Sequence, residues 1–240
     1  MPINPILFFI TAILPYIAII VLVNGLLYRL YKWMSKPKAP ASFTIFPASK
    51  NIGKALTKVL GDILYFQRLL REEKALWLGA WLFHLSLLMV VISHYKVFYS
   101  YMWFWENLNV SADTFALVSD IFDGATGVIM AASLVFLLGR RFTKFLRKLS
   151  VFEDYFALLL ILAIAIAGIY IRFISRVNLL GLRRYFLSLA MFAPSNLPTD
   201  TGFLVHYLLI LILAIYFPLG KMVHTIGAGI TSLLVRLEKR

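Results

Sequence analysis

ALWLGAWLFHLSLLMVVISHY, residues 75–95, lies between Lys74 and Lys96 and contains no Asp, Glu, Lys or Arg. A helix needs roughly 20 apolar residues to cross the hydrocarbon core of a bilayer, so this stretch predicts a membrane-spanning helix. It also contains His84 and His94. Ionisable side chains inside a membrane are rare and are commonly functional, so the two histidines are candidate site residues.

The composition of the whole chain agrees with this interpretation. Its 240 residues are 61% hydrophobic and 15% charged, and its mean hydropathy is +0.85. Soluble globular proteins are about 45–50% apolar and about 25% charged, so the composition indicates an integral membrane protein. We expect one all-α membrane domain over residues 1–240, with five transmembrane helices at about residues 6–27, 75–96, 114–138, 155–174 and 202–224.

Charge and cysteine content exclude several functions. The net charge is +13, but the basic residues flank apolar runs, where they typically set topology and contact lipid headgroups rather than nucleic acid. The chain has no cysteine, which excludes disulfides, thiolate-bound zinc, cysteine-ligated iron–sulfur clusters and covalently attached c-type haem. No basic segment precedes the first apolar run, so we expect a retained helix rather than a cleaved signal peptide.

The distribution of basic residues predicts the orientation. Nineteen of the 24 lysines and arginines fall in the first and third connections and at the C-terminal end. The positive-inside rule then places the N-terminus outside and the C-terminus in the cytoplasm. Residues 32–74 form a basic cytoplasmic connection, and apolar residues at helical spacing within 49–70 predict an amphipathic helix, on the membrane surface or against a partner. A solvated basic connector is the alternative.

The four histidines are predicted to form two pairs at different depths. Because the helices at 75–96 and 202–224 run in opposite directions, His94 and His206 both fall near the outer side, and His84 and His224 near the inner side. His206 and His224 are 18 residues apart, or five helical turns, which would place them on one face. Alternatively, each histidine simply forms a hydrogen bond to a neighbouring helix.

Two opposed imidazoles in a membrane suit haem. Its iron takes two axial ligands, and two facing helices supply a flat apolar slot, whereas zinc and copper sites usually need more ligands. We therefore expect two haem b groups held within the bundle: an inner one on His84 and His224, and an outer one on His94 and His206.

These residues resemble the gamma subunit of respiratory nitrate reductase. The family also includes the membrane cytochromes of heterodisulfide reductase and of the dissimilatory sulfite reductase-associated complex. Leu117 stands where the nitrate reductase subunit has a lysine for its quinol site, and the first cytoplasmic connection is longer, which favours the sulfite reductase-associated or heterodisulfide reductase-like branch. The matching segments are Leu14-Pro15-Tyr16-Ile17-Ala18, Leu82-Phe83-His84 with His94, Gly124-Ala125-Thr126-Gly127, Gly139-Arg140-Arg141, His206, Phe217-Pro218-Leu219 and Val223-His224.

The resemblance implies a quinol-oxidising subunit of an anaerobic respiratory complex in the cell membrane. Menaquinol would be oxidised near the outer haem, and electrons would pass through the inner haem to an iron–sulfur partner on the cytoplasmic side. Further membrane and outer-side subunits would complete the complex, and the subunit would have no terminal reductase activity alone. Three other functions remain open. They are the gamma subunit of a nitrate reductase, a proton- or ion-coupled transporter that uses the histidines with Asp120 and Asp123 as a relay, and a structural membrane anchor whose histidines only pack.

The remaining polar residues have expected roles. Quinol oxidation releases two protons, and Asp120 and Asp123 are the candidate acceptors; the alternative is a structural ion pair with Arg172 or Arg176. Haem propionates need cations, for which we expect Arg172 and Arg176 at the outer haem and Arg140, Arg141 or Lys221 at the inner one. The alternative for each cation is a topology residue whose charge reaches the membrane surface.

Overall fold

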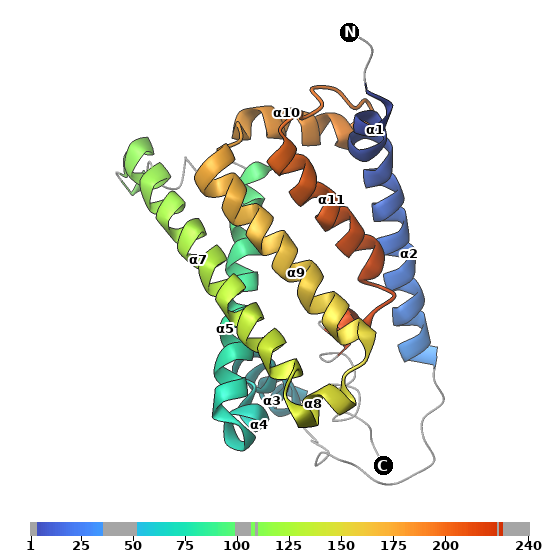
Figure 1. The fold of residues 1–240 in the computed structure, drawn as a ribbon, viewed down its shortest axis with the longest axis vertical. Coiled ribbons are helices and arrows are strands. Elements are labelled where there is room, and N and C mark those ends of the chain that lie inside the picture. Colours follow the sequence, from blue (N-terminus) through green and yellow to red (C-terminus); the bar gives the residue numbers. More distant parts are fainter. Residues whose placement is uncertain (1–3, 36–51, 99–106, 109, 225, 228–240) are drawn as a thin grey trace. The chain divides into compact units, whose positions relative to one another are not determined.

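The computed structural model describes residues 4–35, 52–98, 107–108, 110–224 and 226–227, and every regular element in these residues is helical (Figure 1). The longer helices are α2 (Leu14–Ser35), α3 (Ile52–Tyr65), α5 (Lys74–His94), α7 (Ala112–Arg141), α9 (Phe152–Tyr170), α10 (Leu179–Ala190) and α11 (Thr201–Tyr216). The short ones are α1 (Pro5–Phe8), η1 (Phe9–Ile13), α4 (Gln67–Glu72), η2 (Tyr95–Val97), α8 (Lys144–Leu149), η3 (Ile171–Ser175) and η4 (Lys221–Val223).

Four of the predicted spans correspond to continuous helices that are long and apolar enough to cross a membrane. They run over Pro5–Ser35, Lys74–Val97, Asp113–Arg141 and Phe152–Ser175. The protein is therefore a multi-pass membrane protein with an all-helical fold. The predicted fourth helix was expected to reach about residue 174, and the π-helical turn η3 indeed carries the helix from Tyr170 on to Ser175.

The prediction of one helix over residues 202–224 is wrong at its C-terminal end. α11 ends at Tyr216, and the chain then turns, with the backbone N–H groups of Leu219 and Gly220 both donating to the carbonyl of Tyr216. Pro218 explains the end of the helix, because proline lacks an N–H and disfavours helical geometry in the residue before it. His224 consequently lies beyond the helix, after η4, and the five-turn argument that put it on one face with His206 does not hold.

The chain divides into two compact units: Met1–Ala18 with Leu82–Leu213, and Ile19–Trp81 with Ala214–Arg240. In the first unit α7 and α9 lie side by side (Figure 1). Two glycines of α7 allow this approach: a Cβ on Gly124 would lie 2.7 Å from the ring of Phe173, and one on Gly127 would lie 3.3 Å from Ile169. These small residues serve helix packing.

A proline in the first span is matched by a buried tyrosine. Pro15 has no N–H to donate to the carbonyl of Thr11 four residues earlier, and the Tyr185 hydroxyl donates to that carbonyl instead, at 2.7 Å. Thr11 and Tyr185 are both fully buried. Burial raises the pKa of Tyr185 above its ordinary value, so the hydroxyl keeps the proton it donates. This bond joins α10 to the first span within the first unit.

We predict that Tyr185→Phe destabilises the protein by about 1–3 kcal/mol, because it leaves the buried Thr11 carbonyl without its donor. The measurement is the thermal unfolding midpoint in detergent, with Tyr28→Phe as the control, since Tyr28 is 57% exposed. Equal midpoints for the two variants would show that the carbonyl finds another donor.

Candidate functional site

The structure brings His94 and His206 together. His94 is the last residue of α5, and His206 lies in the second turn of α11. Their ring centroids are 6.2 Å apart and their planes differ by 24°. His206 is buried, at 9% exposure. The two rings therefore face one another from two different helices of the first unit.

Hydrogen bonds fix the tautomer of both rings. Nδ1 of His94 lies 2.7 Å from the carbonyl oxygen of Val90, and Nδ1 of His206 lies 3.0 Å from that of Ile164. A carbonyl can only accept, so in each ring Nδ1 carries a proton, and a neutral imidazole of this tautomer has its lone pair on Nε2. A histidine that ligates a metal typically has this arrangement, with the second nitrogen donating to a backbone carbonyl.

The separation of the rings fits a single iron between them. A metal–imidazole bond is about 2.0 Å long and a ring nitrogen lies about 1 Å from its ring centre, so two ligating imidazoles have centroids roughly 6 Å apart. Within the described residues, no group of three or more His, Asp or Glu side chains could hold a metal ion. Two imidazoles alone suit the axial positions of haem better than a four-ligand zinc site. His94 and His206 therefore fit the predicted haem.

The sequence did not identify Gly168 as part of this site. It lies on α9 directly beside the imidazole, and a Cβ built there would be 3.2 Å from Cε1 of His206. The absence of a side chain lets the ring pack against the backbone of α9 and reach the carbonyl of Ile164. An isolated glycine in an apolar helix was the available signal, because it commonly marks a close approach.

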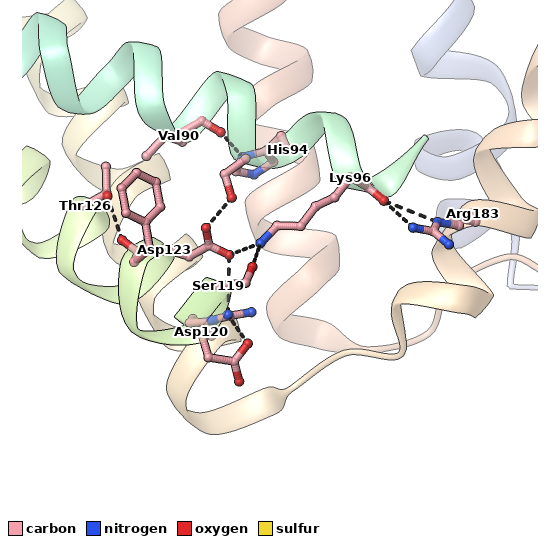
Figure 2. Close-up of polar contacts among 11 residues, drawn as sticks. Val90, His94, Lys96, Ser119, Asp120, Asp123, Thr126 and Arg183 are labelled. Atoms are coloured by element: carbon pink, nitrogen blue, oxygen red, sulfur yellow. Dashed lines mark hydrogen bonds and ion pairs between the residues drawn. The ribbon is translucent and has the colours of Figure 1, made fainter. Parts of the chain in front are cut away.

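Polar side chains connect the end of α5 to α7 close to His94, as Figure 2 shows. Asp123 accepts a hydrogen bond from the hydroxyl of Ser93 and forms an ion pair with Lys96. The Lys96 ammonium also donates to the hydroxyl of Ser119. The Asp123 side chain is only 17% exposed, so its carboxylate has little access to water. Lys96 and Ser93 supply the charge and the hydrogen bond that water would otherwise provide.

Arg172 connects this network to Asp120. Its guanidinium forms an ion pair with Asp120 and lies 3.4 Å from Oδ2 of Asp123. The Asp120 side chain is 66% exposed, whereas that of Asp123 is largely covered. The ion pair with Arg172 that the sequence left open is thus present, and it joins both predicted carboxylates in one network.

Arg183 is a second residue that sequence reasoning did not place. Its Nε and Nη2 both donate to the backbone carbonyl of Lys96, at 3.2 and 2.7 Å (Figure 2). Arg183 comes from α10, so this helix fixes the backbone two residues after His94. No motif in the sequence distinguishes Arg183 from Arg184 beside it.

The second predicted pair is divided between the two units. His84 lies in the first unit, half-buried on α5, with its ring 4.9 Å from that of Phe83. His224 lies in the second unit, and its Nδ1 is 2.9 Å from the carbonyl oxygen of Lys221. Since a carbonyl oxygen can only accept, Nδ1 of His224 carries a proton.

A face of α2 holds the turn that precedes His224. Arg29 donates from Nε to the carbonyl of Pro218 and from Nη2 to that of Leu219, both at 2.9 Å. Gly25, one turn earlier, contacts the Pro218 ring, which a Cβ at this position would approach to 2.5 Å. Arg29 thus satisfies carbonyls that the broken helix leaves free, a role that its sequence position alone did not reveal.

The structure places the candidate propionate cations in different surroundings. Arg141 lies 3.3 Å from the hydroxyl of Ser150 and 3.7 Å from the carboxylate of Asp154, at the turn between α8 and α9. Arg172 pairs with the two aspartates already described. Arg176 ends η3 in a left-handed conformation, with φ of 48°. Arg140 follows Gly139 at the end of α7, and Lys221 begins η4.

Comparison with known proteins gives a consistent family. Residues 68–237 match the nitrate reductase gamma subunit family. The Hdr-like menaquinol oxidoreductase cytochrome b-like subunit of Archaeoglobus fulgidus is 28% identical over 251 residues, covering 90% of this chain and 75% of the relative. The subunit of the same description from Archaeoglobus profundus is 27% identical over 260 residues, covering 89% and 74%. The chain belongs to the nitrate reductase gamma subunit family, in the branch that contains these Hdr-like subunits.

Proposed function

We propose that the protein is the membrane cytochrome b subunit of an Hdr-like menaquinol oxidoreductase and oxidises menaquinol beside a haem held by His94 and His206. The observation that carries this proposal is the pair of facing imidazoles 6.2 Å apart, each with Nδ1 tied to a backbone carbonyl. The names of the Archaeoglobus relatives support menaquinol as the electron donor and the Hdr-like branch as the type of complex.

The chain contributes the ligands and their orientation. The carbonyls of Val90 and Ile164 fix the two rings with Nε2 available, and Gly168 lets the His206 ring lie against α9. A haem bound between the rings supplies an iron that accepts and donates one electron at a time. His84 and His224 would hold a second haem closer to the cytoplasm, with Arg29 fixing the turn before His224.

We assign the uptake of the quinol protons to Asp123 and Asp120, in the network beside His94. A quinol that loses two electrons also loses two protons, which need acceptors near the outer haem. Asp123 would accept a proton from the quinol hydroxyl, and its hydrogen bonds to Ser93 and Lys96 hold the carboxylate in place. Asp120 is 66% exposed and would pass protons to the aqueous outer side.

The chain would cross the membrane five times with its N-terminus outside. This topology would put the polar network near the outer surface and most basic residues in the cytoplasm. α11 is 16 residues long, or roughly 24 Å, and would form the fifth span together with the turn after it. Electrons would leave to an iron–sulfur subunit on the cytoplasmic side, with further membrane or outer-side subunits completing the complex. Arg140, Arg141, Arg172, Arg176 and Lys221 are the proposed propionate cations.

We predict that His94→Ala and His206→Ala each remove one and the same haem of the two, because each loses one axial ligand of a shared iron. Dithionite-reduced spectra and haem content per chain measure this, with His84→Ala and His224→Ala as variants expected to remove the other haem. Loss of different haems in the first two variants would refute the pairing. A colourless wild-type protein would refute the proposed function.

Gly168→Ala is expected to shift the reduction potential and absorption band of the His94/His206 haem, because the new methyl group would displace the His206 ring. Gly139→Ala is the matched control, since a Cβ there has nothing within 4 Å. Both substitutions place alanine in a helix, so a change in stability alone does not distinguish them. Identical spectra and potentials would show that the ring does not depend on this contact.

The double variant Asp120→Asn, Asp123→Asn is predicted to slow haem reduction by a menaquinol analogue on the order of 100-fold, the usual contribution of a positioned proton acceptor. Both haems should remain reducible by dithionite. Asp113→Asn, in the exposed first turn of α7, is the control. An unchanged rate of reduction by the quinol analogue would remove the two aspartates from the proton path.

A further inference from the structure

α3 presents an apolar stripe to its surroundings. Leu56, Leu60, Ile63 and Leu64 are 45%, 47%, 43% and 57% exposed, and their spacing of three and four residues places them on one side of the helix. Val59, at the edge of this side, is buried, at 4% exposure. An exposed contiguous apolar stripe on a helix indicates a surface that meets lipid or another protein.

Two tryptophans attach the end of this helix to the start of α5. The indole N–H of Trp77 donates to the carbonyl of Tyr65 at 2.8 Å, and that of Trp81 donates to the carbonyl of Leu64 at 3.0 Å. The two indoles stack, with centroids 5.8 Å apart. Trp81 is seven residues into α5, or roughly 10 Å along the helix axis.

The C-terminal end of α3 is thus attached to the first two turns of a membrane-spanning helix. An interfacial helix typically buries its apolar face about 5–10 Å into the boundary between headgroups and acyl chains, and tryptophan is enriched at this depth. Leu78, next to Trp77 in the span, is itself 51% exposed, as expected of an apolar residue that a span presents to lipid.

Charge favours lipid over a protein partner. Lys54 and Lys58 are exposed and lie on the side of α3 away from the leucines, at 100° of rotation per residue. A helix with lysines on its polar face and leucines on the other is typical of helices that lie in the membrane interface and attract anionic headgroups.

We propose that α3 lies in the membrane–water interface, with Leu56, Leu60, Ile63 and Leu64 in the acyl boundary and Lys54 and Lys58 on anionic headgroups. The stacked pair Trp77 and Trp81 is the anchor that holds it there. This surface binds lipid whether or not the haem assignment is correct, since it depends only on the span and on α3.

The absence of native cysteine allows a direct test. Single cysteines at residues 56, 60 and 63, and at 54 and 58, are spin-labelled in the full chain in nanodiscs of phosphatidylcholine and phosphatidylglycerol. Labels on the apolar stripe should collide with oxygen, as should a reference label at residue 78 in the span, and labels at Lys54 and Lys58 should collide with a water-soluble nickel complex. Collisions with the nickel complex at every position, or immobile labels shielded from both reagents, would overturn the proposal; the second result would indicate a protein partner.

The headgroup contact has its own test. The double variant Lys54→Gln, Lys58→Gln should bind phosphatidylglycerol roughly tenfold more weakly, because each lysine near a charged surface contributes to binding. Lys32→Gln, which removes a charge from α2 instead, is the control. Trp81→Phe keeps an aromatic ring but removes the donor to Leu64, and should make the labels on α3 shallower. Equal lipid binding by all lysine variants would refute the role of Lys54 and Lys58.

Discussion

Within a bilayer no water is available to satisfy a polar group, so each N–H, carbonyl and imidazole must find its partner in the protein. His206 shows the consequence most directly. Its Nδ1 donates to the carbonyl of Ile164, which satisfies that nitrogen. The approach is close because Gly168 has no side chain. The ring lies with its centroid 6.2 Å from that of His94. The tautomer of a proposed haem ligand thus follows from the same need to pair every polar group.

The same rule accounts for features that would otherwise look unrelated. Pro15 leaves the Thr11 carbonyl without its helical donor, and Tyr185 supplies one. Pro218 ends α11, and Arg29 donates to the carbonyls of the turn that follows. In each case a proline breaks the backbone pattern and a side chain from a distant helix compensates. Tyr185 and Arg29 thereby link segments that are far apart in the sequence.

Charged groups follow this rule at the edge of the membrane. Asp123 is largely covered and is matched by Lys96, Ser93 and Arg172, whereas the more exposed Asp120 is matched by Arg172. Such a network holds two carboxylates beside His94, and the exposed one could pass protons to water, which is what the proposed quinol oxidation requires. The ion pairs do not conflict with the proposed proton transfer, because Asp120 stays 66% exposed to solvent while it is paired with Arg172.

Hydropathy and residue spacing determined the helical class, the membrane location, the four long spans and the family, because these depend on local composition and short motifs. The sequence also brought His94 and His206 to one depth, since antiparallel helices allow only that pairing. It could not foresee that α11 ends at Tyr216, although Pro218 was visible, because apolar residues continue past the proline. The partners of Gly168, Arg29 and Arg183 could not be read from the sequence for another reason. Each residue meets a backbone carbonyl or ring more than 30 residues away, and only tertiary packing decides which distant group a residue contacts.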